Sequence, residues 1–170
     1  GYIGDLKKVE AGVPGKFAIR GGFTGLEEPQ SVPDGFDYEM WAGTTPEAPY
    51  TAARCHFNFR WVNDYAPGYI TDWGAHINDI AQWGNDTERT GPISVEGHGV
   101  FPPEGLYDTA DEWECTYEYA NGVTLICKSG TPGIRFEGTD GWVFVRRGAI
   151  DAHPKSLLRE KIGEDEIRFP

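Results

Sequence analysis

Residues 68–84, GYITDWGAHINDIAQWG, contain an aspartate and a histidine at a spacing that suits proton transfer. Asp72 and His76 are four residues apart, so a helix would place both side chains on one surface, next to each other. A carboxylate beside an imidazole raises its basicity and fixes its tautomer. The pair therefore has the composition of an acid/base catalyst, in which His76 moves the proton and Asp72 orients the imidazole.

The periodicity of the same segment predicts a helix from about Tyr69 to Trp83 with two distinct faces. Apolar residues at the spacing of a buried stripe are Ile70, Trp73, Ile77 and Ile80. The stripe on the far side consists of Asp72, His76, Asp79 and Trp83. This second stripe is either an ordinary solvated face or the wall of an active site, and the tryptophan on it favours the site.

The segment before the helix, residues 55–61 (CHFNFRW), alternates in a way that predicts a strand. Its polar face would carry Arg54, His56, Asn58 and Arg60, which could bind hydroxyls or a carboxylate, or could simply be exposed. A metal site of His56, His76 and Asp72 is a further alternative, but the spacing does not require one. No C-x-x-C occurs among the three cysteines, and we expect no metal.

Composition indicates a globular protein without a nucleic-acid or membrane partner. Of the 170 residues, 39% are hydrophobic and 25% are charged, which is ordinary for a soluble domain. The net charge of −12 would repel a phosphate backbone. No run of eighteen apolar residues is present to span a bilayer. The chain starts without a methionine and enters directly into a strand-like run, so we expect a domain from a longer protein.

The order of elements predicts an α+β fold: an open, mostly antiparallel β-sheet with one main helix packed across it. Strands are expected at residues 3–13, 93–101 and 149–154, and a short helix at 154–163. Two hairpins are expected, one turning at Asn121-Gly122 and one at residues 139–141. Residues 14–53 are expected to be a long loop. We predict that residues 1–170 form a single domain.

Several blocks, in this order, resemble the C-terminal half of glucose–fructose oxidoreductase and inositol dehydrogenase-type proteins, the Gfo/Idh/MocA family. They are MWAGTTPEAPY, RCHFNFRWVNDYAPGYITDWGAHINDIAQW, YEYANGVTLI and FEGTDGWVFVRRG. The resemblance implies a C-terminal domain of the dihydrodipicolinate-reductase type, with an open antiparallel sheet. It also implies an NAD(P)-dependent parent protein whose N-terminal Rossmann domain, holding NAD or NADP, is absent from this chain.

The resemblance carries site residues over by position. The family's helix aspartate and histidine match Asp72 and His76, so His76 would exchange the proton of a sugar hydroxyl while hydride moves to or from the nicotinamide. The segment just before the helix would line the sugar pocket. The full set of expected substrate-binding residues is Arg54, His56, Arg60, Trp61, Asp64, Tyr65 and Asp79.

Two departures from the family pattern define what this chain can do. The catalytic lysine of the family's E-K-P motif is absent, because it belongs to the Rossmann domain, and the triple glycine before the helix is replaced by residues 66–68 (APG). We therefore expect the substrate and oligomerisation half of a sugar or polyol oxidoreductase. The partners expected are a sugar-like small molecule and further copies of the chain, forming a homodimer or homotetramer through the sheet face.

Two other functions remain open at this stage. The parent could be a glycosidase of the redox type that recycles bound NAD, although Asp72 stands where such relatives would be expected to carry a tyrosine-containing pattern. The chain could also be a non-catalytic sugar-binding or oligomerisation domain. The compartment, cytoplasmic or periplasmic, is not determined by the residues.

Overall fold

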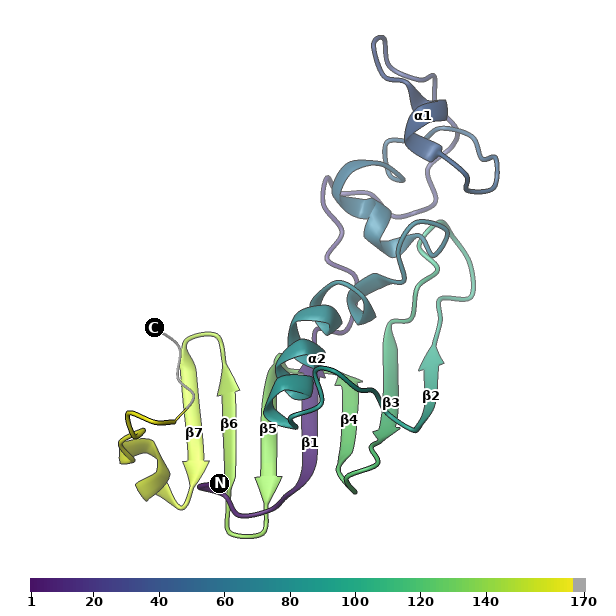
Figure 1. The fold of residues 1–170 in the computed structure, drawn as a ribbon. Coiled ribbons are helices and arrows are strands. Elements are labelled where there is room, and N and C mark those ends of the chain that lie inside the picture. The colour runs from purple at the N-terminus through teal and green to yellow at the C-terminus, as the bar shows by residue number, and fades with distance from the viewer. Residues whose placement is uncertain (167–170) are drawn as a thin grey trace.

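The computed structural model describes residues 1–166, and these form one seven-stranded sheet with a single long helix on it (Figure 1). The strands are β1 (Leu6–Val13), β2 (Ser94–Val100), β3 (Glu112–Glu118), β4 (Thr124–Ser129), β5 (Gly133–Gly138), β6 (Trp142–Arg146) and β7 (Ala149–His153). Their order across the sheet is β2-β3-β4-β1-β5-β6-β7. Neighbours are antiparallel except for β1 and β4, which are parallel. The predicted α+β class is confirmed.

Both predicted hairpins are present. In the first, which joins β3 to β4, the backbone N–H of Tyr119 donates to the carbonyl of Val123 at 3.0 Å. Gly122 in this turn has φ +82°, a conformation that glycine adopts without strain. The second turn joins β5 to β6 and is closed by the N–H of Gly138 donating to the carbonyl of Gly141 at 2.8 Å. Short-range turn chemistry therefore fixes two of the strand pairings.

The main helix, α2 (Trp73–Gly84), packs across β1, β4 and β5 on one face of the sheet (Figure 1). Ile77 and Ala81 are its buried apolar residues, and they join the core with Val9 and Leu125. The helix starts later than predicted, because residues 68–70 form a separate 3-10 turn before it. Ile80 was expected on the buried stripe but is 40% exposed, so the buried face is narrower than predicted.

The predicted strand at residues 55–61 is wrong, because His56–Trp61 is a 3-10 helix. Its buried residues, Asn58 and Trp61, are three apart, which is the spacing that puts side chains on one side of a 3-10 helix. His56 has φ +52°, a backbone conformation incompatible with an extended strand. The shared polar face expected for Arg54, His56, Asn58 and Arg60 therefore does not exist.

A second, smaller core holds the loop region beyond the end of the sheet. Ala53, Trp61, Val62 and Tyr107 are its buried members. Residues 14–53 are irregular as expected, apart from the short helix α1 (Tyr38–Ala42), which lies at the far end of the molecule from the sheet (Figure 1). The segment after β7 begins with a 3-10 helix, Lys155–Arg159, shorter than the helix predicted there.

Candidate functional site

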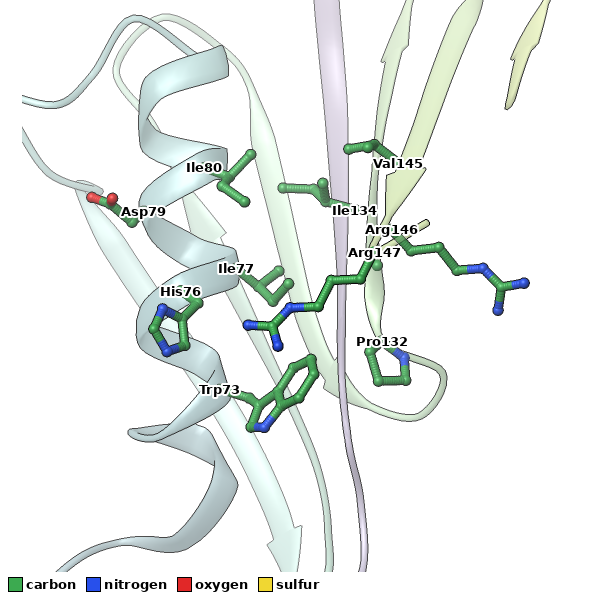
Figure 2. A pocket seen from close by; sticks show the side chains of 11 residues that line it. Trp73, His76, Ile77, Asp79, Ile80, Pro132, Ile134, Val145, Arg146 and Arg147 are labelled. Atoms are coloured by element: carbon green, nitrogen blue, oxygen red, sulfur yellow. The ribbon is translucent and has the colours of Figure 1, made fainter. Parts of the chain in front are cut away.

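A pocket of about 680 Å³ lies between α2 and the neighbouring ends of β5 and β6 (Figure 2). Its volume suits a small-molecule ligand. Apolar side chains form most of the wall, and basic residues stand at the end of β6. The lining residues are Trp73, His76, Ile77, Asp79, Ile80, Pro132, Gly133, Ile134, Val145, Arg146 and Arg147.

His76 stands on the exposed side of α2 at the rim of this pocket. Figure 2 shows His76 and Asp79 on the outer side of the helix, whereas Trp73 and Ile77 are directed toward the strands. No hydrogen bond or ion pair within residues 1–166 occupies the His76 ring. Its nitrogens are therefore available to a ligand, which is the condition for exchanging a proton with one.

Asp72 does not orient His76 in the way that was predicted. It is the residue before α2, with ψ −82°, so it lies outside the regular helix and loses the spacing of a helical pair. Among the described residues its ion-pair partner is Arg60, whose Nε lies 3.7 Å from Asp72 Oδ2. The Asp72–His76 contact is corrected to an Asp72–Arg60 contact.

Arg60 is held in place by its own 3-10 helix. Its guanidinium lies over the rings of Phe57 and Phe59, at 4.4 Å and 5.0 Å from their centroids. Arg60 Nη1 also donates to the carbonyl of Phe57 at 3.1 Å. Stacking and hydrogen bonding fix the planar group, so it presents Nε toward Asp72 with little freedom.

Trp61 does not line the pocket. Its side chain is fully buried in the second core, where its ring centroid lies 4.6 Å from that of Tyr69 and 5.6 Å from that of Phe17. The family resemblance placed it beside the sugar pocket because the segment just before the helix usually lines that pocket. Its actual role in this chain is to anchor the 3-10 helix to the loop that contains Phe17, and we correct its assignment accordingly.

Arg54, His56 and Tyr65 lie among the aromatic rings near α1, outside the pocket lining. His56 stacks on Phe36 with ring centroids 6.4 Å apart, and the Arg54 guanidinium lies 6.0 Å from the centroid of Tyr65. Tyr65 packs against Trp41 with centroids 4.8 Å apart. These three residues therefore form a group separate from His76 within this chain.

Of the expected substrate-binding residues, Asp79 lines the same pocket as His76, while Asp64 is exposed on the turn between the two 3-10 helices.

Arg147 lines the pocket but was not among the site residues expected from the sequence. It follows β6, and its guanidinium lies 4.6 Å from the ring centroid of Trp73 on α2. The two adjacent arginines in VFVRRG are the only sequence signal, and nothing in that signal links them to the helix.

No group of three or more His, Cys, Asp or Glu side chains in residues 1–166 is arranged to hold a metal ion. None of the helices in this part of the chain is long and apolar enough to cross a bilayer.

The family pattern for the C-terminal alpha/beta domain of the Gfo/Idh/MocA oxidoreductases matches residues 7–149. The chain belongs to this family. The match spans the sheet from β1 to the start of β7, including α2 and the pocket, so the resemblance drawn from the sequence blocks is confirmed. The chain is therefore a domain of an oxidoreductase family.

Two solved structures are similar to this Gfo/Idh/MocA domain at 17% sequence identity. Levoglucosan dehydrogenase in complex with NADH and L-sorbose matches with a TM-score of 0.49 over 88% of this chain and 36% of that chain. YvaA of Bacillus subtilis, described as an oxidoreductase, matches with a TM-score of 0.42 over 94% of this chain and 35% of that one. The chain thus spans about a third of the length of each. No curated protein matches it.

The described residues of the Gfo/Idh/MocA domain do not provide a dinucleotide cradle of their own. The parallel pair β1–β4 is the one pairing that a βαβ unit could use, and the chain between these strands contains β2 and β3 as well as α2. A glycine-rich turn from a strand directly into a helix, which holds the pyrophosphate in Rossmann folds, does not occur in residues 1–166. The residues present therefore do not fit a whole dinucleotide.

Proposed function

We propose that this chain is the substrate-binding domain of an NAD(P)-dependent oxidoreductase that acts on a sugar, a polyol or a related hydroxylated compound. The observation that carries the proposal is the position of His76, unpaired on the exposed side of α2 at the rim of a pocket of about 680 Å³. The hydride acceptor, NAD or NADP, would be held by a dinucleotide-binding domain outside this chain.

In this proposal His76 removes the proton from the substrate hydroxyl that becomes a carbonyl, and returns it in the reverse direction. Positioned acid/base groups of this kind contribute about 10² to 10⁴ in rate. Asp79, one turn further along α2 and exposed at the same rim, would accept a hydrogen bond from a second hydroxyl. Trp73 in the pocket wall carries the Arg147 guanidinium over its ring, 4.6 Å from the centroid.

The proposed role of Asp72 is positional: together with Arg60 it holds the 3-10 helix His56–Trp61 against the residue before α2. Arg60 Nε lies 3.7 Å from Asp72 Oδ2. A fixed carboxylate at the start of the helix can accept a hydrogen bond from a substrate hydroxyl.

The test is turnover by the full-length protein that contains this chain, followed as NAD(P)H formation with a panel of sugars and polyols. We expect His76→Gln to lower kcat by about a hundredfold or more, while cofactor binding is retained. His98→Gln is the matched control, because His98 is an exposed histidine on β2, away from the pocket.

Wild-type kcat in His76→Gln would remove His76 from the mechanism. Failure of the full-length protein to bind either dinucleotide would remove the oxidoreductase proposal as a whole. Release of an aglycone without net NADH would instead establish the redox-type glycosidase, and binding of sugar without either reaction would establish a non-catalytic binding domain.

We further propose that the sheet face opposite α2 forms the contact between copies of the chain. α2 packs on the other face, and this face carries apolar side chains among paired charges. Lys8 and Glu10 are joined at 2.5 Å and Arg135 and Glu137 at 2.6 Å, and each of the four side chains is only about a third exposed. The Arg135 guanidinium also lies 4.2 Å from the ring centroid of Trp142. Neutralised charges lying flat on a sheet suit burial against a second sheet.

Sedimentation of wild type and Ile126→Glu tests this assembly. Ile126 lies on the same face as Glu10, its partner in the β1–β4 register, and a new carboxylate there would be buried without a partner in the proposed contact. We expect the variant to be monomeric at concentrations where wild type is a dimer or tetramer. Val95→Glu, on the other face of the edge strand β2, should assemble as wild type does, and a monomeric wild type would contradict the proposal.

A further inference from the structure

Arg147 reaches across the pocket from the strand side to the helix side. It follows β6, and its guanidinium carbon lies 4.6 Å from the ring centroid of Trp73 on α2. Figure 2 shows this guanidinium between the strands and α2, near Trp73 and Ile77, whereas the neighbouring Arg146 points away from the helix. One face of the Arg147 group is thereby occupied by the indole, while its N–H edges are not covered by the Trp73 ring.

The charge of Arg147 is not matched by a carboxylate in the described part of the chain. Arg60 is paired with Asp72 and Arg135 with Glu137, but neither an ion pair nor a hydrogen bond is formed by the Arg147 guanidinium. Asp79 is the acidic residue of the pocket lining, and its carboxylate lies on the outer side of α2 (Figure 2).

Unpaired basic residues are common in this chain, because the ion pairs of the described residues involve only Lys7, Lys8, Arg60, Arg135 and Lys155. What distinguishes Arg147 is that it stacks on Trp73 within the pocket lining. The pocket around it is walled by Ile77, Ile80, Ile134 and Val145, and apolar walls strengthen a charge–charge interaction formed beside them. A stacked guanidinium with free N–H edges has the geometry to bind a carboxylate or a phosphate through two parallel hydrogen bonds.

We propose that Arg147 binds an anionic group, a carboxylate or a phosphate, on the substrate of this pocket. The substrate class is then an acidic sugar derivative, such as an aldonate, a uronate or a sugar phosphate, in place of a neutral sugar. This inference rests on the proposed function for the position of the reacting hydroxyl at His76. The anion at Arg147 and the hydroxyl at His76 would fix the two ends of the ligand across the pocket.

The experiment compares three pyranose probes that differ only in the group at carbon 6: D-glucose, D-glucuronate and D-glucose 6-phosphate. Dissociation constants are measured by calorimetry on the full-length protein, for wild type, Arg147→Gln, Arg147→Lys and Arg159→Gln. We expect wild type to bind at least one acidic probe about tenfold to a hundredfold more tightly than glucose, the range for a hydrogen bond to a charged group. Arg147→Gln should abolish that preference, and Arg147→Lys should retain part of it.

Arg159→Gln is the control for the loss of one positive charge, because Arg159 is exposed on the 3-10 helix after β7 and lies outside the pocket lining. It should keep the preference for the acidic probe. Equal affinities of wild type for glucose and both acidic probes would overturn the proposal. Arg147→Gln that loses affinity for NADH while keeping the acid preference would also overturn it, because the anion bound would then be the cofactor's phosphate.

Turnover separates this inference from the proposed function. Acid preference that depends on Arg147, without NAD(P)H formation from any probe, would leave the anion site standing and remove the oxidoreductase proposal. NAD(P)H formation with the same kcat/KM for glucose and glucuronate would leave the oxidoreductase proposal standing and remove the anion site.

Discussion

The Asp72 carboxylate faces Arg60 and not His76: its Oδ2 lies 3.7 Å from Nε of Arg60, which belongs to the 3-10 helix His56–Trp61. Both side chains are about a third exposed, at 36% and 29%. The interaction therefore links two segments that the sequence presents as separate elements. It also gives Asp72 a positioning partner that comes from outside the helix.

The first prediction is that Arg60→Gln destabilises the fold more than Asp72→Asn does. A partly exposed ion pair is worth at most about 1 kcal/mol, and both substitutions remove it. Arg60→Gln also removes the stacking on Phe57 and Phe59 and the hydrogen bond to the Phe57 carbonyl. Urea denaturation of both single variants and the double variant measures the coupling. An equal loss in the free energy of unfolding for Asp72→Asn and Arg60→Gln would contradict this prediction.

The second prediction concerns the contact between the end of α2 and β5. A Cβ at Gly84 would lie 2.3 Å from Cε1 of Phe136, so Gly84→Ala must push the helix or the ring aside. We expect a loss of about 1 to 3 kcal/mol in the free energy of unfolding, despite the better helix propensity of alanine. Gly91→Ala is the control, since its Cβ would meet no atom within 4 Å.

A second substitution should restore part of the stability lost in Gly84→Ala. Adding Phe136→Leu shortens the opposing side chain, so the double variant should recover part of the loss. A double variant that is less stable than the sum of the two single changes would show that the clash is not the cause.

The third prediction is that Asn58 holds the loop around Arg20 to the second core. Asn58 is 2% exposed, its Oδ1 accepts from the Arg20 N–H at 2.9 Å, and its Nδ2 donates to the Arg20 carbonyl at 2.8 Å. Asn58→Ala leaves backbone groups of Arg20 without these partners, at a cost of about 1 to 3 kcal/mol. Hydrogen exchange should rise at residues 17–23. Asn63→Ala, at an exposed asparagine, should leave that exchange unchanged, and unchanged exchange in Asn58→Ala would refute the assignment.

The fourth prediction is a loss of stability at alkaline pH that depends on Tyr107. The phenol is 3% exposed and donates to the Ala53 carbonyl at 3.1 Å, and burial raises its pKa to about 12. The pKa in the unfolded chain is about 10. The neutral phenol's contribution is therefore complete below pH 10 and is lost as the pH rises from about 10 to 12. Denaturation at pH 8, 10 and 11.5 should show a shallower decline for Tyr107→Phe than for wild type.

Some of that decline remains in Tyr107→Phe, because burial also raises the pKa of Tyr117 to about 12. The variant should also be less stable than wild type at pH 8, where the hydrogen bond to Ala53 is missing. Declines of equal slope in both proteins would show that Tyr107 ionises as easily folded as unfolded.

The sequence predicted those parts of the fold that depend on local chemistry. Asn121-Gly122 specified one hairpin, and residues 139–141 specified the next, because turn geometry is encoded within a few residues. The insertion of β1 between β4 and β5 was not predicted, since Val9 finds Leu125 and Phe136 only through long-range pairing. The 3-10 helix was missed because CHFNFRW alternates like a strand, and the burial of Asn58 and Trp61 is decided by the distant segment around Phe17.

The residues of the candidate site were likewise predicted only where they depend on local pattern. Helical periodicity brought His76 and Asp79 to one pocket, since both depend on a single element. Arg147 could not be assigned from the sequence, because its contact with Trp73 joins the end of a strand to the start of a helix. Arg54 and His56 were grouped with them on the strength of a strand that does not form, and the structure places them among the aromatic rings near α1 instead.

The central position of β1 has a consequence for how the chain is made. Among the strands of this sheet β1 is translated before the others, yet Lys8 pairs with Thr124 on one side and with Glu137 on the other, both far along the chain. The two hairpin sets can form from neighbouring residues on their own, but they become one sheet only when the earliest strand enters between them. Long-range closure of this kind is slow, and until it occurs the apolar residues Val9 and Val13 remain open to solvent and to other chains. The strand that joins the two halves of the sheet is thus, among the seven, the one that waits longest for its partners.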